Sequence, residues 1–278
     1  GDVLLHLGDF ALDNSSKQKE YHSLLKFDTW LAKQTHIPYK IVIRGNHDPI
    51  RYDFTTSKAM YITSPKKIKI YRNFDFTLIP YGNARKLSES GVLKGHQQKS
   101  KSSLPSSGGS DSSSLIVASH IPPYKILDKT YTGKHVGSSF LNNSIRRLSI
   151  PPKLWFVGHI HEGRGITKRK FGSSAKNKYD ETVIINAANA NLGMATHLEN
   201  GPVVVRVFHN NKDNNDSNDN PNIEILKMDD RTINQRLFSN NSNNEGSFFG
   251  RINNNNGQQH QQPVAGGGND YYDDESND

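Results

Sequence analysis

Residues of the types that bind metal ions follow four short hydrophobic stretches of this 278-residue sequence. They are Asp9 after VLLHLG, Asn46, His47 and Asp48 after YKIVIRG, His120 after LIVAS, and His159 and His161 after LWFVG. Carboxylate and amide oxygens, together with imidazole nitrogens, suit Mn²⁺, Fe or Zn²⁺. One such motif recurs by chance, but four in this order indicate a metal site.

The four stretches before these residues have the apolar composition of short buried strands. In open α/β sheets, the loops at the carboxyl ends of the strands converge on one crevice. We therefore expect Asp9, Asn46, His120, His159 and His161 to lie together at one end of the sheets. His47 should lie at the rim of this site.

The segments between the motifs predict helices and further strands. After Asp9 a helix begins near Ser15 or Ser16 and packs through an apolar face. That face would consist of Tyr21, Leu24, Leu25, Trp30 and Leu31. KIKIYRN and FDFTLIPYG predict a hairpin, a second helix would pack through Leu141, Ile145 and Leu148, and TVIINAA and PVVVRVF predict two more strands. The mixture predicts an α/β fold.

The order of the motifs, GD, GNHD, a single His and GHIH, resembles that of the calcineurin-like metallophosphoesterases. The segments SHIPP and HVGSSFLNNSIRRLSIPPKLWFVGHIHEGRG are similar to the metallophosphoesterase-domain-containing (MPPED) subfamily. The resemblance covers residues 1–208 and implies one domain, a two-sheet sandwich flanked by helices. The family has a D-x-H motif on a strand upstream of the GD strand, and the sequence begins after that position. We therefore expect a domain without its N-terminal strand and without two metal ligands.

In that family two metal ions share a bridging aspartate and a bridging hydroxide. The resemblance assigns the bridge to Asp9. It assigns one metal to Asn46, His120 and His159, and the other to His161. Two divalent ions about 3.5–4 Å apart can generate hydroxide and clamp a phosphoryl group. The implied function is hydrolysis of a small phosphate ester or cyclic nucleotide, as a phosphodiesterase, with Mn²⁺ expected ahead of Fe or Zn²⁺.

Other polar residues adjoin the candidate ligands. His47 is not needed as a ligand and is placed to protonate a leaving alkoxide, with Asp48 orienting its ring. Arg44 and Arg164 are candidates for contacting a substrate phosphate. A helix N-terminus after His135 could receive an anion. Purely structural roles stay open for these residues. Asp9 and Asn46 could be turn residues, His120 could be structural, Arg164 could be a solvated loop residue, and His135 could simply lead into a helix.

Composition limits the other functions. The formal charge is +8, but the local clusters, at Lys66, Lys67 and Lys69 and at 168–170, lack interleaved aromatic residues. Nucleic-acid binding is therefore disfavoured, whereas a basic surface would attract phosphate-bearing substrates. The absence of cysteine excludes disulfides and thiolate ligands and fits an intracellular, cytoplasmic protein. The sequence has no apolar run of membrane length.

Two stretches have too little apolar area to offset the entropy of ordering the chain. One is a Ser-rich insertion at about residues 88–114, and the other is an Asn-rich tail at residues 209–278. We expect residues from about 96 to 113 and from about 209 to 278 to be disordered. Within the tail, NIEILKM could add an edge strand or be merely a sticky segment.

An alternative to an enzyme is a non-catalytic scaffold on the same fold, binding metal or another protein. The expected loss of the D-x-H motif favours the scaffold for the sequence as it stands. The intact GNHD and GHIH motifs favour an enzyme for the parent protein, because a scaffold does not need His47 beside a set of ligands for one metal.

Overall fold

The computed structural model describes residues 1–11, 16–71, 74–82, 88, 90–93, 114–148, 151–171, 181–190, 201–208, 222–228 and 231–236. All of them belong to one compact unit, Gly1–Ser239. The segment 94–113 and most of the range 209–278 lie outside the described residues, so the disorder expected there stays a prediction.

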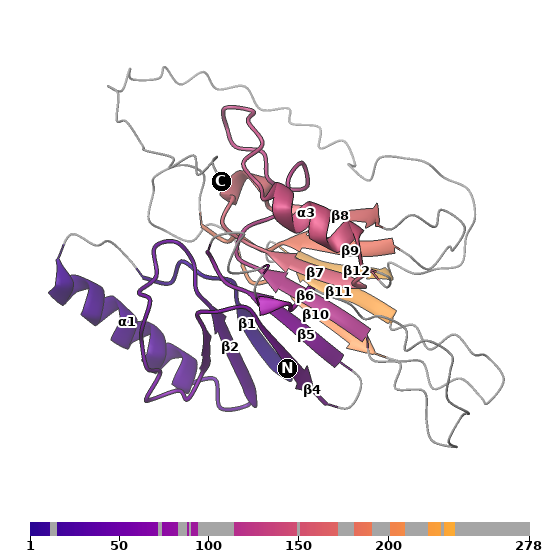
Figure 1. Cartoon of the computed structure of the whole chain (residues 1–278). Coiled ribbons are helices and arrows are strands. Elements are labelled where there is room, and N and C mark those ends of the chain that lie inside the picture. Colours follow the sequence, from indigo (N-terminus) through magenta and orange to yellow (C-terminus); the bar gives the residue numbers. More distant parts are fainter. Residues whose placement is uncertain are drawn as a thin grey trace, which may run out of the picture. The chain divides into compact units, whose positions relative to one another are not determined.

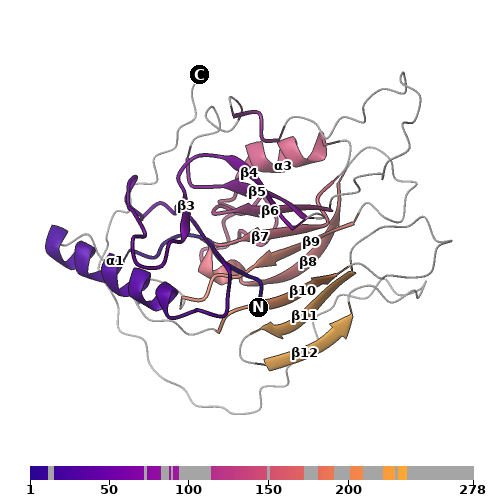
Figure 2. The ribbon, with the colours of Figure 1, turned by 90° about the horizontal axis from the view of Figure 1, so that it is seen from below.

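A six-stranded sheet forms the centre of this unit. Its order is β4 (Lys66–Ile70), β5 (Phe74–Ile79), β6 (Ser114–Ser119), β7 (Leu154–Val157), β9 (Glu181–Asn186) and β8 (Gly165–Lys170). The four inner strands are parallel and the two outer strands, β4 and β8, are antiparallel to their neighbours. Figure 2 shows the strands in this order. The predicted β4–β5 hairpin and the strands of the LIVAS and LWFV stretches are confirmed.

Two three-stranded sheets complete the architecture (Figure 1). One contains the parallel strands β1 (Val3–His6), β2 (Tyr39–Ile43) and β3 (Met60–Ile62). The other contains the antiparallel strands β10 (Val204–Phe208), β11 (Asn222–Met228) and β12 (Arg231–Arg236). Side chains from both, such as Ile41 and Ile223, share one core with Leu78 and Ile185 of the central sheet. The predicted α/β fold with sheets packed face to face is confirmed.

Strands β11 and β12 lie in the range that composition predicts to be disordered. Ile223 and Ile225 are 2% and 1% exposed and pack into the shared core, with the half-buried Glu224 between them. For NIEILKM the structure thus has the strand alternative, because a short apolar alternation is enough when a sheet supplies the rest of the core. NIEILKM is not an edge strand, however, since it pairs with β10 on one side and β12 on the other.

Among the described residues, helices α1 (Lys17–Ala32) and α3 (Ser139–Arg146) pack on the sheets. Helix α1 buries Leu24 and Leu31 in a cluster with Phe10, Val42 and Phe54. The predicted apolar face of α1 is only partly right, because Tyr21, Leu25 and Trp30 are 64%, 42% and 47% exposed. Ser15, a candidate for its cap, lies outside the described residues.

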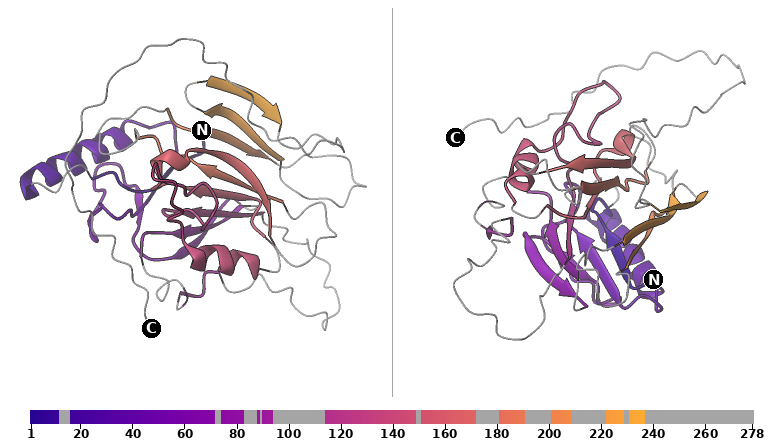
Figure 3. Two further views of the ribbon diagram at one scale, coloured as in Figure 1. Left: turned by 90° about the horizontal axis from the view of Figure 1, so that it is seen from above. Right: turned by 90° about the vertical axis from the view of Figure 1, so that its right-hand side faces the viewer.

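Helix α3 (Ser139–Arg146) packs as predicted, through the buried side chains of Leu141 and Ile145, with Leu148 just beyond its end. Ser138 caps it by accepting a hydrogen bond from the N–H of Leu141 at 3.2 Å. Figure 3 shows α3 and the β10–β12 sheet on opposite sides of the six-stranded sheet. Alternate residues of β6 and β7 therefore face two different cores.

Ile225→Ala tests whether β11 belongs to the core. Because the side chain is 1% exposed, we expect its truncation to lower the free energy of unfolding by about 2–5 kcal/mol. Urea unfolding measures this, with Ile50→Ala, at a position 71% exposed, as the matched control. Equal stabilities of the two variants would show that β11 adds nothing to the folded unit.

Candidate metal centre

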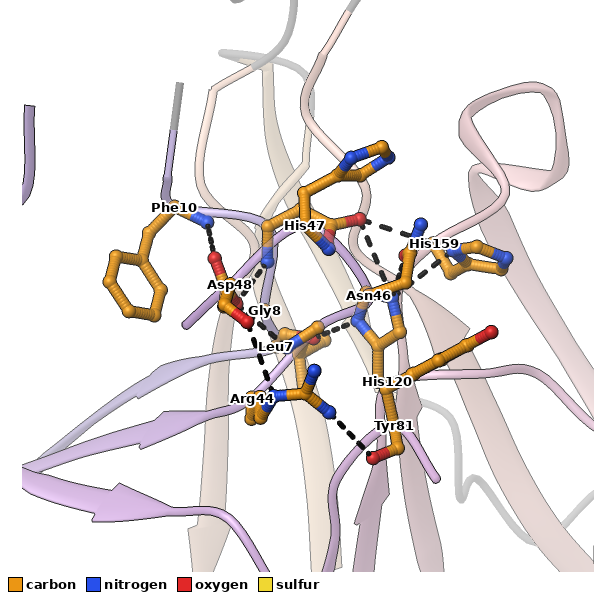
Figure 4. A network of polar contacts seen from close by, with 12 residues as sticks. Leu7, Gly8, Phe10, Arg44, Asn46, His47, Asp48, Tyr81, His120 and His159 are labelled. Carbon is orange, nitrogen blue, oxygen red and sulfur yellow. Dashed lines mark hydrogen bonds and ion pairs between the residues drawn. The ribbon is translucent and has the colours of Figure 1, made fainter. Parts of the chain in front are cut away.

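The loops that follow β1, β2, β6 and β7 meet at one place (Figure 4). Ligand atoms of Asp9, His120 and His159 all lie within 4.8 Å of one another. The Oδ1 atom of Asn46 lies 3.0 Å from Nε2 of His120. The structure thus brings together four of the five side chains that we expect at one end of the sheets.

His120 is fully buried and its ring orientation is fixed by one contact. Its Nδ1 lies 2.6 Å from the carbonyl oxygen of Leu7. A carbonyl can only accept, so Nδ1 carries the proton and donates it, and Nε2 of the neutral ring carries the lone pair. That lone pair faces the centre of the cluster, where Nδ1 of His159 is 3.1 Å away and Oδ2 of Asp9 is 3.4 Å away.

These atoms fit a bound cation better than they fit one another. Burial is the main cause that lowers the pKa of His120, to about 4, so the ring is neutral at neutral pH. Two acceptors, Oδ1 of Asn46 and Oδ2 of Asp9, then face its lone pair at hydrogen-bonding distances. Such atoms repel unless a positive charge lies between them, and this O/N set suits Mn²⁺, Fe or Zn²⁺.

Asp9 carries the negative charge of the cluster. Burial alone would raise the pKa of its carboxyl, but a hydrogen bond from His159 and the proximity of His120 lower it more. The N–H of His47 also donates to Oδ1 of Asp9, at 3.1 Å. The net result is a pKa well below the usual range, so the carboxylate is ionised whenever the protein is folded near neutral pH.

The backbone is strained where two of these side chains attach. Asp9 and His159 both have left-handed backbones, with φ of 59° and 64°. This conformation costs a residue with a side chain about 1–3 kcal/mol and persists where the surroundings enforce it. At His159 the chain therefore leaves the extended path of β7, and Ile160 after it is buried. His161 instead opens the short 3₁₀ helix η1 (His161–Gly163) and is outside the cluster of mutually close donors.

Two glycines allow the loops to approach each other. A Cβ atom added to Gly8 would lie 2.5 Å from Nδ1 of His120, and one added to Gly45 would collide with the carboxylate of Asp9. Gly8 also has a φ of 106°, a backbone conformation that residues with a side chain rarely adopt. The glycines of the GD and GNHD motifs therefore allow the two backbones to come into contact. The residues after them supply the ligand atoms.

Asp48 holds the same two loops together. Its carboxylate is buried and accepts four backbone hydrogen bonds: from Asp9 and Gly45 at 2.7 Å, from Phe10 at 2.8 Å and from Ala11 at 3.0 Å. Burial raises the pKa of this carboxyl, while the N–H groups act in the opposite direction. The predicted role of orienting the His47 ring does not match this geometry, because both oxygens are on backbone amides. The exposed His47 ring points away from His120 (Figure 4).

The sequence matches a family model described as calcineurin-like phosphoesterase, over residues 1–163. The chain belongs to the calcineurin-like phosphoesterase family. It is also similar to Metallophosphoesterase domain-containing protein 1 of human and of mouse, with 30% identity to each over 196 residues. Each match covers 60% of this chain, which spans 56% of the length of these relatives. In the part of the chain that the structure describes, no helix is long and apolar enough to cross a membrane.

Both arginines that the sequence offers as phosphate ligands contact backbone carbonyls in this phosphoesterase domain. Arg44 donates to the carbonyl oxygens of Asp48 and Tyr81, each at 3.2 Å. Arg164 donates to those of Ala188 and Gly201, each at 2.8 Å. These contacts link the two guanidinium groups to neighbouring backbone segments. Binding of substrate by the two arginines stays a prediction.

The loop between β6 and α3 contains a polar pair, Asp128 and His135, where the sequence suggested an anion site. Asp128 is fully buried and its Oδ1 lies 2.7 Å from Nδ1 of His135. Oδ2 of Asp128 accepts from the N–H of Gly137 at 2.9 Å. The Asp128 carboxylate thus occupies the position before α3 where a bound anion would lie. This supports the interpretation that His135 only leads into the helix.

Two further residues near the centre were missed because neither is a typical metal ligand. The ring of Tyr81 lies 6.0 Å from that of His120, between centroids. The hydroxyl of Ser119 donates to the carbonyl oxygen of Ile121 at 2.7 Å and accepts from the indole N–H of Trp155 at 2.9 Å. These bonds tie the turn at His120 to the buried side of the central sheet. No sequence pattern marks them, since His120, which Tyr81 contacts, and Trp155, which Ser119 contacts, are distant from them along the chain.

Asp48→Asn tests the clamp between the loops. An amide offers one acceptor oxygen, and its NH₂ group would face two backbone donors that are now paired. We expect the free energy of unfolding to fall by about 2–5 kcal/mol, as for buried donors left without partners. Urea unfolding measures this, with the exposed Asp53→Asn as the control for the same chemical change. A loss no larger than that of the control would show that the clamp is dispensable.

Metal titration tests the cluster itself. Because the described residues place one group of three close carboxylate and imidazole donors, we expect this chain to bind close to one Mn²⁺ ion tightly. His120→Ala and His159→Ala should each weaken binding at least about tenfold in calorimetry. His36→Ala, an exposed histidine of no motif, should leave it unchanged. Two tightly bound ions, or unchanged binding by both ligand variants, would contradict this assignment.

Proposed function

We propose that this protein hydrolyses phosphate esters with the help of bound divalent metal ions, and that it is a phosphodiesterase. The observation that supports this most directly is the convergence of Asp9, His120 and His159 in a family of phosphoesterases. The relatives carry the word metallophosphoesterase in their names. A small phosphate ester or cyclic nucleotide is the proposed substrate.

In this proposal Asp9 would be shared by two metal ions, because a carboxylate has two oxygens. Asn46, His120 and His159 would complete the set around the tightly bound ion, and the second ion, with His161, would bind this chain more weakly. Such ions supply a nucleophile from water near neutral pH and neutralise the charge of the phosphoryl group. Mn²⁺ is the first choice for this set of oxygen and nitrogen donors, and Fe or Zn²⁺ also fit it.

His47 is the proposed general acid. It directly follows Asn46, its backbone N–H is bonded to Asp9, and its side chain is exposed. An exposed imidazole can take a proton from solvent and give it to a leaving alkoxide that lies beside the ligands. The orientation of its ring would come from the bound ester rather than from Asp48, whose oxygens are on backbone amides.

The electrostatics of the chain favour such a substrate. The formal net charge of +8 attracts phosphate-bearing molecules toward the surface. The half-buried carboxylate of Asp9 and the neutral ring of His120 would then hold the cations that neutralise the ester. In this proposal the net positive charge attracts the substrate, and the negative charge of Asp9 attracts the metal.

Two substitutions separate metal binding from proton transfer. In the protein expressed from its complete coding sequence, Mn²⁺ should support hydrolysis of an aryl phosphodiester. His47→Ala should lower the rate by about 10²–10⁴ for an alkyl leaving group while sparing metal binding. With a nitrophenolate leaving group, which needs little protonation, the loss should be smaller. Asp9→Ala should abolish hydrolysis and weaken Mn²⁺ binding together. Rates and metal contents of the same preparations provide both measurements.

Each part of the proposal has its own contrary outcome. If His47→Ala lost metal as fully as Asp9→Ala, or left both kinds of ester unaffected, His47 would not be the general acid. A protein that binds Mn²⁺ yet hydrolyses no ester would instead be a metal-binding or protein-binding scaffold.

A further inference from the structure

Tyr81 lies against two of the candidate metal ligands. It follows β5 by two residues, and its ring meets that of His120 edge-on, at 6.0 Å and 83° between the ring planes. The ring of His159 lies 6.3 Å away at 45°. Tyr81 therefore borders the metal centre without offering a typical metal-ligand atom.

The backbone of Tyr81 is fixed to the GNHD loop. Its N–H donates to the carbonyl oxygen of Arg44 at 2.8 Å, and its own carbonyl oxygen accepts from Nη1 of Arg44 at 3.2 Å. On the other side, the N–H of His120 donates to the carbonyl oxygen of Ile79 at 3.0 Å. Because its segment is bonded on both sides, the ring has a defined place before any ligand arrives.

The hydroxyl end of Tyr81 is different from its packed ring. Tyr81 is 38% exposed, and its hydroxyl makes no hydrogen bond with the residues that the structure describes. Figure 4 draws this hydroxyl on the side toward which the His159 ring extends. By contrast, the hydroxyl of Tyr61 donates to the carbonyl oxygen of Pro49 at 2.6 Å. A phenol held by its ring and open at its O–H is suited to donating to a ligand.

We propose that Tyr81 is a substrate-binding residue whose hydroxyl donates a hydrogen bond to a non-bridging oxygen of the phosphoryl group. This inference rests on the proposed function, because the metal ions are what bring a phosphoryl group to this place. The atoms of Asp9, Asn46, His120 and His159 that face the centre are then occupied by metal. Tyr81 supplies a neutral donor next to them, aimed at an oxygen that carries charge in every phosphate ester and in phosphate itself.

The test is binding of inorganic phosphate to the Mn²⁺-loaded full chain. Hydrogen bonds to charged groups contribute enough that Tyr81→Phe should weaken phosphate binding by about 10- to 100-fold in calorimetry. The binding of Mn²⁺ alone should not change, because phenylalanine keeps the ring that packs on His120 and His159. The control is Tyr39→Phe, at a position of similar exposure (39%) at the far end of β2 from the GNHD loop, which should leave both affinities unchanged.

Three outcomes would overturn the inference. The first is unchanged phosphate affinity in Tyr81→Phe. The second is an equal loss of Mn²⁺ affinity, which would make Tyr81 a packing residue for the ligands. The third is a metal-loaded chain that binds no phosphate. Since both titrations measure binding rather than turnover, failure of the proposed hydrolysis alone would leave them unaltered, so the two ideas can fail separately.

Discussion

One buried carboxylate sets the geometry of the site. Asp48 accepts hydrogen bonds from the backbone of both the GD loop and its own loop, and so holds two strands' ends at a fixed separation. The close approach of Gly8 and Gly45, the left-handed turn at Asp9 and the position of Asn46 all depend on that separation. Backbone N–H groups, rather than charged side chains, balance the charge of the buried Asp48 carboxylate.

A second constraint comes from the central sheet. The parallel strands β6 and β7 end at the same level, so His120 and His159 emerge side by side. The bond from His120 to the carbonyl oxygen of Leu7 then joins this sheet to the loop after β1. The metal centre is therefore the seam between two sheets, and each contributes half of its donors. Burial of His120 within this seam keeps its ring neutral and its lone pair directed inward.

Much of this arrangement follows from sequence because apolar strands ending in ligand residues are a strong local signal. The convergence of Asp9, Asn46, His120 and His159 needed only the rule that parallel strands end at one edge. The sequence could not reveal the task of Asp48, since its four partners are backbone amides that leave no side-chain pattern. The sequence could not decide between a strand and a sticky segment for β11 for a related reason. Two isoleucines within an Asn-rich range are a weak signal, yet they complete a core built by other strands.

The outer strands of the six-stranded sheet carry a charge pattern with a different significance. β4 presents Lys66, Lys67 and Lys69, and β8 presents residues 168–170, and each strand has a neighbour on one side among the described strands. Glu181 and Asp75 neutralise only part of this charge. Two molecules approaching edge to edge would bring rows of like charge together, which opposes the strand addition that starts aggregation. The basic character of this chain thus protects its sheet, independently of any ligand.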